Sequence, residues 1–172
     1  MSADVHHSLV IPPSEVDASR LLSWWSYLVP KPGRVLGLSP FGDWFLEQAN
    51  GAIWRLDVLD GSFDEIAPSA EAFLTALDTD AAQDDWLQAG TVRALEREGQ
   101  LRRPSQCYTY VVHPRLGAPV DTSNIQLGDL GAWQLFCSQL HPQLDAVPER
   151  AQITRLDCDA DGRLTVEWRM DS

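Results

Sequence analysis

Three alternating aspartates and a glycine open the stretch DCDADGRLTVEW, which runs from Asp157 to Trp168 and begins like an EF-hand calcium loop. Such a loop holds Ca²⁺ through carboxylate and carbonyl oxygens, and it needs a helix on each side and a bidentate glutamate at its twelfth position. Counted from Asp157, the twelfth position is Trp168, and Glu167 comes one residue too early. Whether the stretch binds calcium therefore depends on whether the flanking segments are helices or strands.

Cysteines and histidines form a second set of residues that could do chemistry. Cys107 and His141 stand in the chain order of a cysteine hydrolase, but a nucleophile and its base are recognised by geometry and not by order. Cys137 and His141 lie four residues apart and could share one helix face, yet a zinc site needs about four ligands. Buried cysteine is also among the commonest core residues. We predict structural roles here, with no catalytic residue, metal or cofactor, and keep a small enzyme using Cys107 and His141 as the alternative.

The elements that must position these residues begin with a helix and an antiparallel sheet. Ser14 and Asp17 have the spacing of a capping box, and the pattern up to Pro30 predicts a helix of about four turns. The strand-like runs RVLGL, DWFLEQ, AIWRLDV and SFDEIA follow. An Asn-Gly pair at 50–51 and an Asp-Gly pair at 60–61 favour tight turns between them, because both residues tolerate positive φ. Together they predict an antiparallel meander.

Helices and single strands alternate in the second half of the chain. Apolar residues at helical spacing predict helices after the cap Ser69 and in two segments between 86 and 99. The run CYTYVV at 107–112 predicts a buried strand, and NIQL predicts a shorter one. A further helical stripe runs from Leu130 to Leu144, and Pro142 should kink or break that helix.

Two alternating runs, QITRLDC and RLTVEWR, bracket the aspartates. Alternation is typical of strands, with Ile153, Arg155 and Asp157 on one face of the first run, so residues 159–162 are predicted to form a hairpin turn without metal. The order of elements predicts a single α+β domain over residues 1–172. It would consist of an antiparallel β-meander with packed helices and a C-terminal β-hairpin, with residues 1–13 flexible.

Charge is distributed unevenly. The chain carries 13 basic and 25 acidic residues, a net charge of −12, which argues against binding to nucleic acid or to an anionic membrane and permits a basic partner. No Lys or Arg occurs between Leu56 and Val92. The acids of this segment are Asp57, Asp60, Asp64, Glu65, Glu71, Asp78, Asp80, Asp84 and Asp85. They form either a solvated face or a binding surface, and the sequence leaves both open.

The remaining features bear on location and on exposed aromatic residues. The chain has no apolar run near the roughly 20 residues of a membrane span, and its start lacks the basic region of a signal peptide. The three cysteines form no disulfide framework. We therefore expect a cytoplasmic protein. Trp24 and Trp25 point about 100° apart on a helix, so one of them is expected to be partly exposed.

A longer stretch, FGDWFLEQANGAIWRLDVLDGSFDEIAPSAEAF at 41–73, is similar to the signature of a bacterial domain long described as of unknown function. That domain forms the C-terminal part of type VI secretion immunity proteins that neutralise a DNase effector. The second half of the signature also matches, from about Pro40 to Leu144 in all. It comprises Gln106-Cys107-Tyr108, Pro114, Leu116-Gly117, Asn124, Gln139 and His141. More loosely, the architecture resembles the SUKH immunity proteins.

The resemblance implies a non-enzymatic immunity protein that binds a cognate secreted toxin, a nuclease with a basic active-site cleft. An acidic surface would complement such a cleft and accelerate encounter. The predicted toxin-binding residues are Asp78, Asp80, Asp84 and Asp85 near a helix–helix junction, then Asp57, Asp60, Asp64 and Glu65, and the aromatic Trp24. A housekeeping module that has kept the fold without a toxin is a further alternative.

Overall fold

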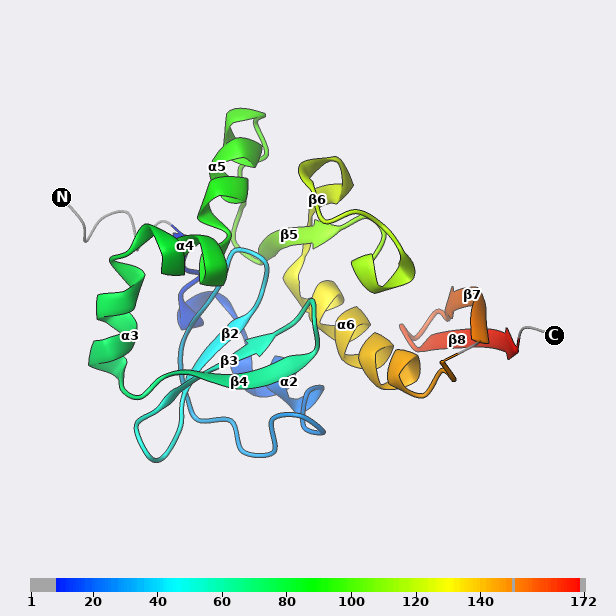
Figure 1. The fold of residues 1–172 in the computed structure, drawn as a ribbon, viewed down its shortest axis with the longest axis horizontal. Coiled ribbons are helices and arrows are strands. Elements are labelled where there is room, and N and C mark those ends of the chain that lie inside the picture. Colours follow the sequence, from blue (N-terminus) through cyan, green and yellow to red (C-terminus); the bar gives the residue numbers. More distant parts are fainter. Residues whose placement is uncertain (1–8, 150, 171–172) are drawn as a thin grey trace.

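Four consecutive strands form an antiparallel sheet in which each strand pairs with the next (Figure 1). The strands are β1 (Arg34–Leu38), β2 (Trp44–Glu47), β3 (Ile53–Asp57) and β4 (Ser62–Ala67). The computed structural model describes residues 9–149 and 151–170. The Asn-Gly and Asp-Gly pairs lie in the β2–β3 and β3–β4 turns, and their glycines have φ of 84° and 68°. The predicted meander is confirmed.

Helices cover both faces of this sheet. On one face, the Phe45 ring of β2 lies 5.2 Å from the Phe73 ring of α3 (Ala70–Leu77). The Phe73 ring in turn stacks on Trp86 of α4 (Asp80–Leu87), which α5 (Ala89–Arg97) follows. On the opposite face, Trp44 contacts α6 (Leu130–Asp145), and α6 also contacts α2 (Ala18–Ser23). The predicted α+β class is correct, and the sheet lies between the two groups of helices.

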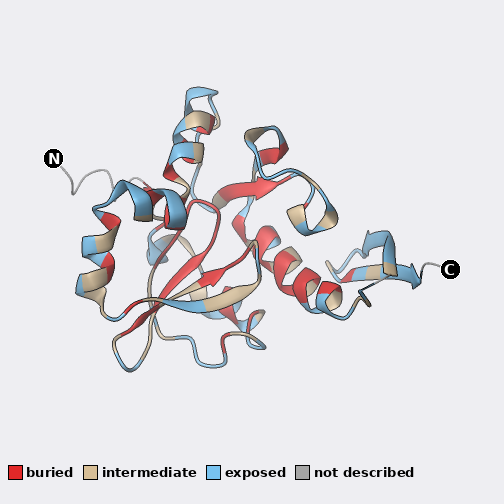
Figure 2. Ribbon diagram, viewed as in Figure 1, coloured by how far each residue is buried: buried red, intermediate tan, exposed pale blue. Residues whose placement is uncertain are grey.

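The rest of the chain adds two small sheets. Strand β5 (Gln106–Tyr110) pairs with β6 (Ile125–Asp129), and β7 (Ala151–Cys158) pairs with β8 (Leu164–Met170), both antiparallel. Three short 3₁₀ turns are η1 (Pro13–Glu15), η2 (Pro114–Leu116) and η3 (Thr122–Asn124). Buried residues concentrate in β2, β3, β5 and α6, whereas the β7–β8 hairpin is mostly exposed (Figure 2). Among the described helices, none is long and apolar enough to cross a membrane.

One buried side chain joins three parts of the core. The Oε1 atom of Gln134 in α6 accepts hydrogen bonds from the indole N–H of Trp25 (2.8 Å) and of Trp44 (3.0 Å). Its Nε2 atom donates to the carbonyl of Gly42 at 2.7 Å. Gln134, Trp25 and Trp44 are all 0% exposed. The glutamine thus satisfies two buried donors and one buried acceptor, which would be costly to leave unpaired.

Three expectations about the N-terminal half and α6 were wrong. Residues 1–13 were expected to be flexible, but Leu9 and Ile11 are buried, and Ile11 forms a β-bridge with Leu38; residues 1–8 lie outside the described part. The first helix is short and begins after Asp17, whose carboxylate accepts the Arg20 N–H at 3.1 Å. Ser14 belongs to η1 instead, so it does not cap the helix and the predicted capping box does not form.

Pro142 does not break α6, which continues to Asp145. A proline within a helix removes the hydrogen bond to the carbonyl four residues earlier, here that of Ser138. Because Pro142 lies in the last turn, no further turns have to bend around it. The helix therefore tolerates a residue that the sequence indicated as its end.

The aspartate-rich stretch is a hairpin turn, as predicted. The Asp159 carboxylate accepts the backbone N–H groups of Asp161 (3.0 Å) and Arg163 (2.8 Å), and Gly162 has φ of 78°. Asp157 pairs with Arg155 at 2.9 Å. Asp159 thus has a local role that explains its presence in the turn, and Asp157 has an ion-pair partner on its own strand.

A β-bulge changes the predicted faces of the hairpin. Between Ile153 and Arg155 the first strand advances two residues while the second advances one. Ile153 therefore faces the same side as Leu156, and not the side of Arg155 and Asp157 as strict alternation would require. The apolar residues of both strands consequently share one face.

Calcium is expected to leave the stability of this protein unchanged. The Asp159 carboxylate is already occupied by backbone donors, and the flanks are strands, so no EF-hand cage can form. Thermal unfolding followed by circular dichroism with millimolar CaCl₂ and with chelator should give the same midpoint. A calcium-dependent rise of several degrees would contradict this, because a ligand bound to the native state must stabilise it.

Candidate functional site

The predicted acids do not form one site, but several lie exposed on neighbouring elements. Asp64 and Glu65 are exposed on β4, and Glu71 is exposed on α3. Asp80 and Asp85 are exposed on α4. Strand β4 and helices α3 and α4 follow one another in the chain, and α3 contacts both of the others. Asp64 pairs with Arg55, which pairs with Phe45, so Asp64 points to the side of α3 and α4, whereas its neighbour Glu65 points to the opposite face. We call Asp64, Glu71, Asp80 and Asp85 the acidic surface.

Asp57, one of the predicted binding residues, is largely buried. It is 9% exposed, at the end of β3, and its carboxylate forms an ion pair with Arg55. Its other oxygen accepts the Asp60 N–H at 2.9 Å. The Asp57 side chain therefore stabilises the β3–β4 turn, and the exposed Asp60 lies in the turn itself.

Asp84 is exposed but has a structural contact. Its carboxylate accepts the N–H of Gly90 in the first turn of α5 at 2.9 Å. The residue at the N-cap position of α5, Gln88, provides no side-chain cap and has a positive φ of 50°. Asp84 thus satisfies an N-terminal amide of the next helix from α4. Asp78 is the exposed C-cap residue of α3.

Trp24 lies away from the acidic surface. It is half-buried, whereas Trp25 is fully buried, so one of the pair is partly exposed as expected, although both residues follow the end of α2 at Ser23. Its ring lies 5.6 Å from the Arg20 guanidinium and lines a depression of about 400 Å³ with Asp129 and Leu130 at the start of α6. It therefore lies with α6, on the opposite side of the meander from α3 and α4.

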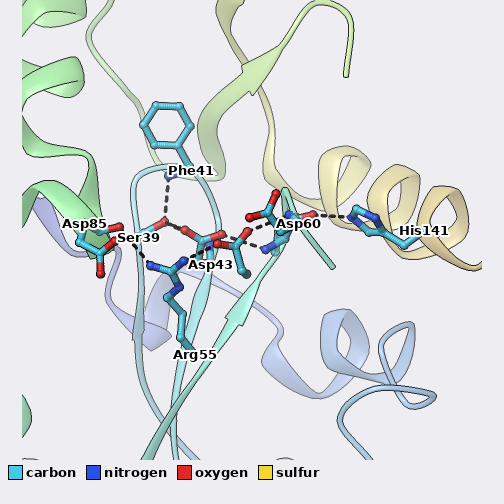
Figure 3. A network of polar contacts seen from close by, with 9 residues as sticks. Ser39, Phe41, Asp43, Arg55, Asp60, Asp85 and His141 are labelled. Carbon is cyan, nitrogen blue, oxygen red and sulfur yellow. Dashed lines mark hydrogen bonds and ion pairs between the residues drawn. The ribbon is translucent and has the colours of Figure 1, made fainter. Parts of the chain in front are cut away.

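A buried polar network, missed from the sequence, connects the meander to α4 and α6 (Figure 3). The Asp43 carboxylate accepts the Ser39 hydroxyl at 2.8 Å and the Val58 N–H at 2.9 Å. Arg55, beside it, donates to the backbone carbonyl of Asp85 in α4 at 3.1 Å. Asp43 is 6% exposed. The carboxylate holds the turn before β2 against the segment that follows β3.

Burial, aided by the nearby charge of Asp57, raises the pKa of Asp43 to about 7. Such a shift is typical both of catalytic acids and of structural buried carboxylates. Here both carboxylate oxygens have protein donors and the side chain is enclosed, which favours the structural role. The only sequence signal was the Asp43 of the FGD motif, and nothing local showed that it faces inward.

The alternative catalytic pair is not assembled. Since Arg115 can only donate, His141 accepts its guanidinium N–H at Nδ1 (2.8 Å), and Nε2–H donates to the Val58 carbonyl (2.9 Å). Burial lowers the pKa of His141. No hydrogen bond joins Cys107 to His141 among the described contacts, and burial raises the pKa of the Cys107 thiol well above its usual range. Both nitrogens of the predicted base are thus engaged, and the thiol stays protonated.

No family model matches the sequence, and a search of curated proteins found no match. The fold is similar to the crystal structure of Atu4351 from Agrobacterium tumefaciens, with a TM-score of 0.52 and 18% identity. The likeness shows the fold alone. It covers 73% of this chain and 65% of that one, so this chain spans just under two thirds of the length of Atu4351.

Proposed function

We propose that this chain is a non-enzymatic immunity protein that binds a cognate secreted toxin in the cytoplasm and occludes its active site. The toxin would be a nuclease effector of type VI secretion. The observation that carries the proposal is the acidic surface on β4, α3 and α4. A nuclease binds phosphate, so its cleft is basic and attracts an acidic partner.

The cations that border the acidic surface are engaged elsewhere. Arg55 pairs with Asp57, and Arg93 donates to the side-chain oxygen of Gln83 at 3.2 Å. No Lys or Arg lies between these two arginines in the sequence. The exposed carboxylates of Asp64, Asp80 and Asp85 therefore have no nearby cation in the sequence that is free to neutralise them. This supports a surface with an unbalanced negative potential, which a basic partner would balance.

The direct test is co-purification of tagged protein with the product of the adjacent gene. An immunity protein is expected to form a stable complex with a neighbouring nuclease and to abolish its DNA cleavage. If the neighbour encodes no toxin, and the pure protein instead turns over a substrate, the proposal is wrong.

The double change Asp80→Asn and Asp85→Asn is expected to slow association with the toxin by roughly 3–10-fold at low salt. Both residues are exposed on α4, and asparagine keeps their size, so folding should persist. The difference should shrink at high salt, where charges farther apart than the Debye length no longer interact. Stopped-flow binding at two salt concentrations measures both effects. Asp84 is left unchanged because it caps α5.

A matched control removes the same charge elsewhere. Glu149→Gln and Asp161→Asn change two exposed acids near and within the β7–β8 hairpin. The control should retain most of the wild-type association rate. Equal slowing by both pairs would show that only total charge matters, and an unchanged rate for the α4 pair would show that the acidic surface is merely solvated.

A further inference from the structure

The β7–β8 hairpin has one apolar face, of which only the part nearest the turn is covered by α6. Leu164 and Val166 of β8 pack on Leu140 and Leu144 of α6. Further along, Ile153, Trp168 and Met170 remain 38%, 43% and 54% exposed. They share the face of Leu164 because β8 alternates without interruption and the bulge brings Ile153 opposite Trp168. The far half of the hairpin thus presents an uncovered apolar surface.

The backbone edge of β8 is likewise half covered. Gln139 of α6 accepts the Leu164 N–H at 3.0 Å and donates to the Gly162 carbonyl at 2.8 Å. Gln143 does the same for the Val166 N–H (2.9 Å) and the Leu164 carbonyl (2.9 Å). Two side-chain amides thus replace a neighbouring strand for the first half of the edge.

The second half of this edge has no neighbouring strand. In an antiparallel pair, every second residue directs its N–H and C=O away from the partner strand. The backbone N–H groups of Leu164 and Val166 point away from β7, so those of Trp168 and Met170 do too. The described part of the sheet has no strand beyond β8. An open edge of this kind can pair with another strand.

We propose that this open edge pairs with the same edge of a second copy of the chain. Two β8 strands would run antiparallel about a twofold axis at Trp168. Each Trp168 would then donate its N–H to the carbonyl of Trp168 in the other copy. Each Met170 N–H would donate to the Val166 carbonyl of the other copy. Pairing would end there, because the Val166 N–H already donates to the side chain of Gln143.

The charges of β8 are complementary to themselves in this register. With Trp168 opposite Trp168, Glu167 of each copy lies opposite Arg169 of the other, on the polar face. Opposite charges at directly paired positions stabilise a sheet, and like charges destabilise it. On the apolar face, Val166 lies opposite Met170. An isologous contact of this kind requires a self-complementary surface, and the sequence VEWRM supplies one.

The rest of the molecule does not oppose this contact. Helices α3 and α4, which carry most of the acidic surface, lie at the other end of the molecule from the hairpin, and β4 lies between these helices and the hairpin (Figure 1). The hairpin itself carries Arg155, Arg163 and Arg169 against Asp157, Asp159, Asp161 and Glu167. Pairing over one strand is much smaller than the roughly 20–30 residues a side of a standard interface, so the dimer should depend on concentration.

The test is a charge-swap cycle read by sedimentation velocity over a range of concentrations. Glu167→Arg and Arg169→Glu should each place like charges opposite one another and raise the dimer dissociation constant on the order of 10-fold. The double swap should restore wild-type dimerisation, because it recreates both pairs with reversed sign. Circular dichroism melts verify that each variant is folded.

A second variant tests the edge independently of charge. Met170→Pro removes an outward N–H without touching a bond to β7 and should weaken the dimer, whereas Met170→Val should not. A wild-type monomer at every concentration overturns the proposal. So does a double swap that dimerises no better than the single swaps. If the hairpin variants alter only the binding of the proposed toxin, the edge serves a different protein and the second-copy assignment is wrong.

Discussion

Replacing Gln134 by leucine is expected to lower the free energy of unfolding by about 3–5 kcal/mol. Leucine fills the space but cannot hydrogen-bond, so the indole N–H groups of Trp25 and Trp44 and the carbonyl of Gly42 all lose their partner. Each unsatisfied buried group costs about 1–3 kcal/mol, and the added apolar contact offsets part of the sum. Urea unfolding followed by tryptophan fluorescence measures the change directly.

A surface glutamine provides the control for Gln134. Gln126 is exposed on β6, and its change to leucine should alter stability by no more than about 0.5 kcal/mol. A loss below about 1 kcal/mol for Gln134→Leu would contradict the expectation. It would mean that the indoles find other acceptors, and that the glutamine does not hold α2, β2 and α6 together.

The second large effect is expected from the pH dependence of Asp43→Asn. In the folded protein the pKa of Asp43 is about 7, above the value of about 4 in an unfolded chain. Between these values the unfolded state releases the proton and the folded state retains it, so Asp43 stabilises less as pH rises, by up to about 1.4 kcal/mol per unit. Asparagine does not titrate and should gain about 2–3 kcal/mol relative to wild type between pH 5 and pH 8.

The comparison must be made between variants because histidines act in the opposite direction. Burial lowers the pKa of His113 to about 4, so its contribution is full above about pH 6.5 and is lost as pH falls toward 4. His141 has a lowered pKa for the same reason. These terms cancel in the difference between wild type and Asp43→Asn.

Ser39→Ala serves as the control for Asp43, because it removes the hydroxyl bonded to Asp43 and keeps the titrating group. It should lower stability, yet its pH profile should still differ from that of Asp43→Asn. Urea unfolding at four pH values gives the required differences. Parallel profiles for wild type and Asp43→Asn would show that Asp43 is ionised in the folded protein throughout.

Sequence reasoning succeeded where the signal was local. The Asn-Gly and Asp-Gly pairs located the turns of the meander, and alternation with Asp159 and Gly162 located the hairpin. The long stripe from Leu130 located α6. Each of these signals depends on a few neighbouring residues whose backbone preferences decide the structure.

The errors arose where distant residues decide. Nothing next to Gln134 shows that two indoles from α2 and β2 converge on it. The carboxylate of Asp84 caps the following helix, and Asp57 turns inward to Arg55, so two predicted binding residues have structural contacts. The bulge at Ile153 could not be predicted from the alternating pattern either. The extra residue is tolerated because it places the apolar residues of both strands on one face, and that depends on the partner strand.

The pairing of α6 with the edge of β8 is possible because four residues of a helix and two residues of a strand have nearly the same length. Four residues of α-helix advance about 6 Å, and two residues of β-strand advance about 6.8 Å. Gln139 and Gln143 can therefore match Leu164 and Val166, but the mismatch accumulates, and the helix face also rotates about 40° with every four residues. A helix can follow a straight strand edge for about two such steps before their directions diverge. The far end of β8 is thus left without a partner for a geometrical reason, which applies wherever a straight helix takes the place of a neighbouring strand.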